Sequence, residues 1–77
     1  MNLTEMAVAS QCRILTAAVN NSELQSRLYA LGLYPGVSVD ILRYAPTGDP
    51  IQLRVGGTTL LSIRKQEAEL VSVEAIG

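Results

Sequence analysis

Apolar and polar residues alternate in short runs along most of the chain, which predicts a mainly β fold. The runs Val37–Ile41 and Ile51–Val55 show a two-residue period, typical of strands that bury one face. The five predicted strands cover residues 12–19, 37–41, 51–55, 59–64 and 71–73. A charged helical turn is predicted over residues 64–69, and the turn-forming segment Ala45–Pro50 separates the second strand from the third.

One segment follows the helical period instead, and it predicts an α-helix over Ser22–Leu31. Ser22 can cap the first free amides, and Gln25 three residues later completes a capping box. Gly32 is the residue type that commonly ends a helix, and Tyr34–Val37 has the Pro-Gly centre of a type II turn. Three leucines lie on one helical stripe and are predicted to be buried: Leu24, Leu28 and Leu31.

The register of the third and fourth strands follows from their apolar positions. A three-residue loop, Gly56–Thr58, pairs Leu53 with Leu61 and Ile51 with Ile63, which places all four side chains on one face. A two-residue loop would turn the apolar side chains of the fourth strand outward. Three-residue hairpin loops with a left-handed glycine are common, so the longer loop is predicted.

Five short strands with a helix inserted after the first predict a small, strongly bent antiparallel barrel. At 77 residues, the chain has room for one domain, residues 1–77. A hydrophobic core this small contributes only about 3–5 kcal/mol to the stability of the fold. Closure of the barrel would remove exposed strand edges without a disulfide or a metal.

Composition excludes several classes of chemistry. The chain has no histidine and one cysteine, so it cannot alone build a four-ligand zinc site, an internal disulfide or a histidine general base. The net charge of −1 and the lack of a basic run argue against nucleic-acid binding. No GxxxxGK[ST] or GxGxxG phosphate loop is present. We therefore expect no enzyme activity, cofactor, catalytic residue or metal-binding residue.

The chain contains no apolar run long enough for a membrane-spanning helix and no signal-peptide pattern at its start. These features predict a cytoplasmic protein without direct membrane insertion. Hydrophobic residues make up 48% of the chain, which is more than so small a core can bury. The surplus either is the ordinary apolar share of a protein surface or forms a patch that a partner covers.

Three motifs carry a family resemblance. Arg27–Gly36 (RLYALGLYPG), Ala45–Ile51 (APTGDPI, with Val37, Val39 and Arg43 before it) and Ile63–Val73 (IRKQEAELVSV) occur in order. Together they resemble the FeoA family of bacterial ferrous-iron transport proteins.

The resemblance implies an SH3-like barrel, a cytoplasmic location and a non-enzymatic role as an adaptor or regulator. The implied partner is a FeoB-like membrane transporter with a GTPase domain. The alternative is a stand-alone metal- or ligand-sensing domain related to the C-terminal domain of iron-dependent repressors. Self-association remains open in both cases.

A few side chains that the predicted core does not need are candidates for binding a partner. Tyrosine and arginine are enriched at interface hot spots. The candidate partner-binding residues are Tyr29, Leu33, Tyr34, Arg43, Tyr44 and Asp49. The alternative is a solvated surface on which Arg43 and Asp49 form an ordinary weak ion pair.

The carboxylates and the one cysteine are poor candidates for a ferrous-iron site. Ferrous sites usually include imidazole, so the scattered carboxylates would form at most a weak oxygen site. Cys12 is predicted to be a small buried hydrophobe rather than a reactive thiol. The carboxylates concerned are Asp40, Asp49, Glu67, Glu69 and Glu74.

Overall fold

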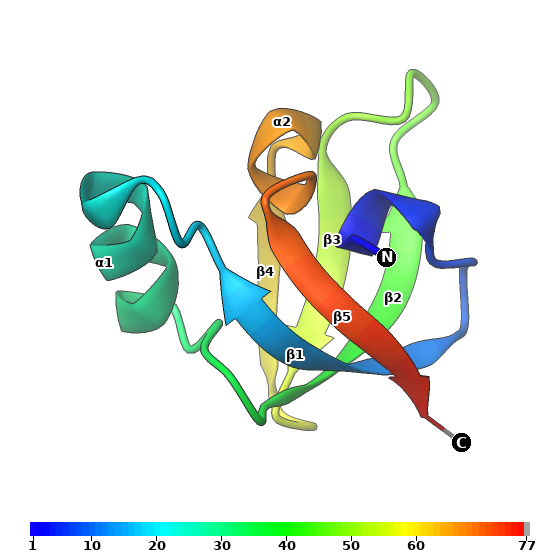
Figure 1. Cartoon of the computed structure of the whole chain (residues 1–77). Helices are drawn as coiled ribbons and strands as arrows, with labels where there is room; N and C mark the ends of the chain where they lie inside the picture. The colour runs from blue at the N-terminus through cyan, green and yellow to red at the C-terminus, as the bar shows by residue number, and fades with distance from the viewer. Residues whose placement is uncertain (77) are drawn as a thin grey trace.

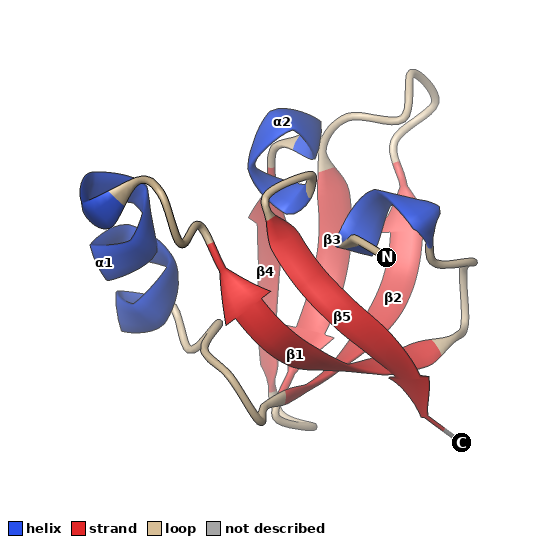
Figure 2. Cartoon of the chain, viewed as in Figure 1, coloured by secondary structure: helices blue, strands red, loops and turns tan. Residues whose placement is uncertain are grey.

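The computed structural model describes residues 1–76, which form a bent five-stranded antiparallel sheet with helices at its margins (Figures 1 and 2). In chain order the elements are the 3-10 helix η1 (Leu3–Glu5), β1 (Gln11–Ala17), α1 (Ser22–Ala30), β2 (Ser38–Tyr44), β3 (Ile51–Val55), β4 (Thr59–Ile63), α2 (Lys65–Ala68) and β5 (Val71–Ile76). The predicted mainly β fold with one inserted helix and a late helical turn is confirmed.

The strand order in the sheet is β4-β3-β2-β1-β5, and every pairing is antiparallel. Register shifts between Ile14 and Thr16 in β1, and between Ile41 and Arg43 in β2, mark bulges. Bulges bend strands and increase their twist. Figure 1 shows the result: β1 and β5 cross the row of β2, β3 and β4.

The two edges of the sheet differ. Beside β5, Asn2 forms an isolated bridge with Ser72, and the Val73 N–H donates to the Met1 carbonyl oxygen (2.8 Å). Within residues 1–76, β4 pairs with β3 alone. The expectation that closure removes both exposed edges is therefore wrong at β4, because no ladder joins it to β5.

The hairpin between β3 and β4 has the predicted register. Ile51 pairs with Ile63, Leu53 with Leu61, and Val55 with Thr59. Gly56 and Gly57 both have positive φ (62° and 83°), a conformation that glycine adopts without steric cost. Burial of the apolar face therefore selects the register, as expected.

Helix α1 begins differently from the prediction. The cap is Asn21, whose Oδ1 accepts a hydrogen bond from the Leu24 N–H (3.0 Å). Gln25 does not complete a capping box; its side-chain amide donates to the Ala17 carbonyl oxygen (2.9 Å), which ties the helix to the end of β1. Asparagine and serine cap equally well, so adjacent Asn21 and Ser22 could not be distinguished from the sequence.

The ends of β1, β2 and β5 differ from the prediction by two or three residues. β1 ends at Ala17, before Ala18 adopts a positive φ of 47°, and not at Val19. β2 continues past its bulge to Tyr44, and β5 continues to Ile76 because it pairs with β1 along its length.

The core fills the inside of the bent sheet and extends to the N-terminal segment. Leu3 is fully buried and Met6 nearly so, although sequence reasoning assigned no structure to this segment. Asn2 and Glu5 form a capping box around η1, with the Asn2 N–H donating to Glu5 Oε1 (2.8 Å). Among residues 1–76, no helix has the length and apolar character to cross a bilayer.

Candidate protein-docking surface

The C-terminal end of α1 is held by a Schellman motif. The Gly32 N–H donates to the Tyr29 carbonyl oxygen (3.0 Å), and the Leu33 N–H donates to the Leu28 carbonyl oxygen (2.9 Å). Gly32 has a φ of +94°, which favours glycine. This arrangement directs Leu33 back onto Leu28, and both side chains are fully buried.

Leu33 is thus a core residue, and its predicted place on an exposed surface is wrong. Leu31 has the opposite outcome: it was predicted to be buried, yet its side chain is 42% exposed. The chain reverses direction at Gly32, so the Schellman turn buries Leu33 and leaves Leu31 at the surface. The missed signal is a leucine directly after the terminal glycine, the position that contacts the last helical turn.

The same turn places two tyrosines side by side on the surface. Tyr29 and Tyr34 are 41% and 48% exposed, and their rings form an edge-to-face pair with centroids 6.3 Å apart and an interplanar angle of 68°. Edge-to-face contacts are a favoured aromatic geometry. Pro35 and Gly36 follow in the predicted type II turn, in which the Val37 N–H donates to the Tyr34 carbonyl oxygen (3.2 Å) and Gly36 has a φ of +94°. We call Tyr29 and Tyr34 the tyrosine pair.

The other predicted partner-binding residues lie elsewhere. Arg43 and Tyr44 stand at the end of β2, whereas Tyr34 precedes its start. Seven strand residues span about 20 Å. The structure therefore does not bring Arg43, Tyr44 and Asp49 together with the tyrosine pair.

Tyr44 and Asp49 serve local structure. The half-buried Tyr44 hydroxyl donates to the carbonyl oxygens of Leu3 (3.3 Å) and Met6, which fastens the N-terminal segment to β2. Burial, with a smaller contribution from Cys12, raises the pKa of Tyr44. Asp49 accepts a hydrogen bond from the Lys65 N–H (3.0 Å) at the start of α2. Among residues 1–76 no ion pair joins Asp49 to Arg43, which is exposed.

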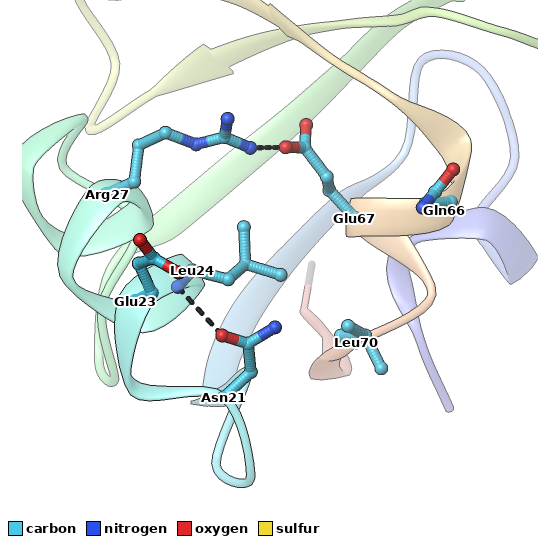
Figure 3. A pocket seen from close by; sticks show the side chains of 7 residues that line it. All are labelled: Asn21, Glu23, Leu24, Arg27, Gln66, Glu67 and Leu70. Carbon is cyan, nitrogen blue, oxygen red and sulfur yellow. Dashed lines mark hydrogen bonds and ion pairs between the residues drawn. The ribbon is translucent and has the colours of Figure 1, made fainter.

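A groove of about 480 Å³ separates α1 from α2 (Figure 3). It was not foreseen from the sequence, because its two walls are about 40 residues apart in the chain. Leu24 and Leu70 give it an apolar part, and the remaining groups are polar. The residues that line it are Asn21, Glu23, Leu24, Arg27, Gln66, Glu67 and Leu70.

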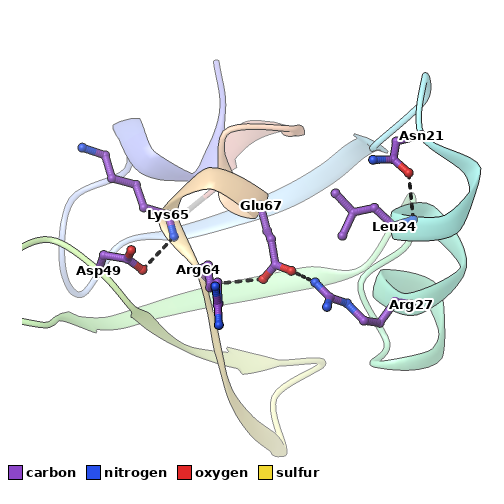
Figure 4. A network of polar contacts seen from close by, with 7 residues as sticks. All are labelled: Asn21, Leu24, Arg27, Asp49, Arg64, Lys65 and Glu67. Atoms are coloured by element: carbon purple, nitrogen blue, oxygen red, sulfur yellow. Dashed lines mark hydrogen bonds and ion pairs between the residues drawn. The ribbon is translucent and has the colours of Figure 1, made fainter.

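Glu67 connects the two helices across this groove (Figure 4). One carboxylate oxygen accepts from the Arg64 N–H (3.1 Å), and the other pairs with the Arg27 guanidinium. The Glu67 side chain is only 14% exposed, whereas Arg27 is 59% exposed. The ion pair links α1 to α2. It also engages the Glu67 carboxylate, which the sequence offered as a weak metal ligand.

Cys12 is completely buried. Burial, and to a smaller extent the nearby Asp40 carboxylate, raises the pKa of the Cys12 thiol to about 11. The thiolate is the reactive form, so the thiol is unreactive at neutral pH, and the prediction of a buried hydrophobe is confirmed. Within residues 1–76, His, Cys, Asp and Glu side chains do not gather in groups of three or more that could hold a metal ion.

Comparison with family models shows which protein family the chain belongs to. The FeoA domain model matches residues 1–75. The chain belongs to the FeoA family. This match begins at Met1, so it includes the N-terminal segment, in which none of the three motifs lies.

Solved structures agree with this assignment. Iron(II) transport protein A from Clostridium thermocellum is 34% identical, with a TM-score of 0.89 over 99% of this chain and 46% of that one. FeoA from Stenotrophomonas maltophilia, crystallised with zinc and described as a prokaryotic SH3 domain protein, is 27% identical, with a TM-score of 0.80 over 96% of this chain and 89% of that one. The predicted SH3-like fold of this FeoA-family protein is therefore confirmed.

A manganese-dependent transcriptional repressor shares the fold alone. It is 8% identical, with a TM-score of 0.90 over 99% of this chain and 36% of the repressor. The expected structural relation to repressor domains is thus present.

Proposed function

We propose that this FeoA-family protein is a cytoplasmic accessory protein that docks on a FeoB-like membrane GTPase transporter and modulates ferrous-iron uptake. The observation that carries the proposal is the tyrosine pair, two exposed aromatic rings held on a rigid turn. Membership of a ferrous-iron transport family supports the choice of partner. Tyrosine is among the residue types that dominate binding energy at protein interfaces.

Rigidity makes the tyrosine pair suited to docking. Tyr29 lies on α1, and Tyr34 follows the Schellman turn that Leu33 anchors in the core. Side chains that are already ordered lose less conformational entropy when they bind. Tyrosine also supplies a large contact area with few rotatable bonds.

Docking of this kind changes transport by shifting a conformational equilibrium. If the protein binds one conformation of the transporter more tightly, it raises the population of that conformation by its differential affinity. Such coupling free energies are typically about 1–3 kcal/mol. Nucleotide hydrolysis would then belong to the transporter, and this chain would contribute contact surface alone.

The test is a calorimetric titration against the soluble GTPase domain of the transporter. We expect the double variant Tyr29→Ala/Tyr34→Ala to bind at least about tenfold more weakly than the wild type, because two hot-spot side chains are removed. The matched control is Val19→Ala, an apolar residue that is 65% exposed on a different loop, and it should bind as the wild type does. Equal affinity of the double variant and the control would refute docking through the tyrosine pair.

A metal-responsive role is the second candidate, supported by the zinc complex of the Stenotrophomonas maltophilia relative. Anaerobic calorimetry with ferrous or manganous ion distinguishes it from docking. A saturable signal with a stoichiometric endpoint for the chain alone would favour sensing. Heat of dilution alone, together with binding to the GTPase domain, would favour docking.

A further inference from the structure

Among the described residues, 1–76, β4 is an open edge strand whose backbone groups have no ladder partner on the side away from β3. The Gly56 N–H donates to the Ser38 carbonyl oxygen (2.9 Å), so the amide of Gly56 points toward β2. Backbone groups alternate in direction along a strand. Val55, Leu53 and Ile51 therefore direct their amides toward β4.

The same alternation determines which groups of β4 are free. The strand residues paired with Val55, Leu53 and Ile51 are Thr59, Leu61 and Ile63. The residues between them, Leu60 and Ser62, direct their N–H and C=O groups away from β3. No hydrogen bond from either amide to another described group is present outside the sheet.

Native proteins usually protect such an edge with lysine, proline, a bulge or a covering segment. β4 has none of these features: its sequence TLLSI is uncharged, and its register with β3 is unbroken over five pairs. At the other edge of the sheet the N-terminal segment covers β5. The fold thus protects one edge and leaves the other open.

The surroundings of β4 provide room for an added strand. In Figure 1, β4 is the last strand of its row, on the side where α1 stands. A groove of about 280 Å³ lies between the C-terminal end of α1, at Arg27 and the capping residue Leu31, and Ser62 and Ile63 of β4. A second groove of about 200 Å³ follows the sheet face beside Leu60, whose side chain is 66% exposed.

The charges around this edge indicate the chemistry of the occupant. Among residues 1–76, Arg64 and Lys65 at the end of β4 form no ion pair, and neither does Arg43 on β2. Arg54, opposite Leu60, has only a long contact (3.9 Å) with Asp40. Two carboxylates lie near the same end: Glu67, which is paired with Arg27, and Asp49, which accepts from the Lys65 N–H. Arg64 and Lys65 together outweigh Asp49, so the edge is apolar in its middle and carries a net positive charge at its C-terminal end.

We propose that the β4 edge binds an extended segment of a partner protein by strand addition, and that this segment is apolar in its middle with an acidic residue at the end that lies beside Arg64 and Lys65. Main-chain hydrogen bonds to Leu60 and Ser62 would supply affinity, and the grooves would select side chains. A second copy of the chain fits less well, because its own β4 strand carries no carboxylate that could meet Arg64 and Lys65.

The test uses two synthetic peptides, acetyl-EVTVTVE-amide and its lysine-ended counterpart acetyl-KVTVTVK-amide, with the ¹⁵N-labelled full chain. In the free protein we expect fast amide exchange at Leu60 and Ser62, and protected amides at Thr59, Leu61 and Ile63. The acidic peptide should slow exchange at Leu60 and Ser62 at least about tenfold. It should also bind at least about tenfold more tightly than the lysine-ended peptide.

Ser62→Pro removes one outward N–H without breaking a bond to β3, and proline is tolerated at such edge positions. It should weaken binding of the acidic peptide about tenfold, whereas the matched variant Ser62→Ala keeps the N–H and should bind normally. Unchanged exchange at Leu60 and Ser62 in millimolar peptide would overturn the proposal. So would protection that rises with protein concentration alone, which would indicate a second copy.

The exchange measurement on the wild type decides the question even if Ser62→Pro fails to fold. Neither groove beside β4 is lined by the tyrosine pair. The assay contains no transporter, so its failure would leave the proposed docking function untouched.

Discussion

Replacing Leu33 by alanine should destabilise the fold far more than replacing Leu31, although the helical pattern of the sequence indicates the opposite. Leu33 is fully buried against Leu28, and Leu31 is 42% exposed. Leu33→Ala removes about three apolar carbon groups, which at about 0.8 kcal/mol each is about 2.4 kcal/mol of transfer free energy. The cavity left behind raises the cost to about 2–5 kcal/mol.

This loss is large for the chain. Domains are stable by about 0.05–0.15 kcal/mol per residue, or about 4–12 kcal/mol for this length. Urea denaturation followed by far-ultraviolet circular dichroism measures the effect. With a slope near 1 kcal/mol per M, the low end for small proteins, the midpoint should fall by about 2 M or more.

Leu31→Ala is the matched control, because it makes the same chemical change two residues earlier. It should lower the free energy of unfolding by less than about 1 kcal/mol, since its side chain is already partly in water. Equal losses for the two variants, or a larger loss for Leu31→Ala, would refute the assignment of Leu33 to the core and with it the Schellman turn that orients the tyrosine pair.

Three further predictions concern other parts of the fold. Burial raises the pKa of the Cys12 thiol to about 11, so the folded state favours the protonated thiol. Stability should be intact below about pH 9 and fall as the pH rises through 11. In alkaline urea titrations Cys12→Ala should show a smaller fall than the wild type, and the fall that remains belongs to Tyr44, whose pKa burial also raises. Tyr44→Phe removes the hydroxyl hydrogen bonds to the N-terminal segment, so the free energy of unfolding should fall by about 1 kcal/mol. The Val73 amide, which donates to Met1 of that segment, should exchange faster, and unchanged exchange would contradict this role of Tyr44. A double-mutant cycle with Arg27→Gln and Glu67→Gln should give a coupling below about 1 kcal/mol, because Arg27 is mostly exposed, and a value of several kcal/mol would show that the pair is buried in solution.

The features that could be predicted from the sequence are those where one local rule acts alone. The register of β3 with β4 follows from a single requirement, that Leu53 and Ile63 share a buried face, and the structure has it. Positive φ at Gly32 and at Gly36 likewise follows from residue type and position.

The features that could not be predicted depend on contacts between distant segments. Leu3 is buried in the core, and its carbonyl oxygen accepts a hydrogen bond from Tyr44, 41 positions later. No local pattern reveals this contact. Glu67 finds Arg27 across the groove between two helices for the same reason. For the candidate site, sequence reasoning selected both members of the tyrosine pair but grouped them with residues from the far end of β2.

An NMR titration of the ¹⁵N-labelled protein with the cytoplasmic GTPase domain of the transporter shows directly whether the tyrosine pair is the docking surface. We expect the largest amide shift changes to cluster over residues 29–36, around the tyrosine pair, and to saturate with added domain. Shift changes confined to other surfaces, or none at high micromolar concentration, would contradict it.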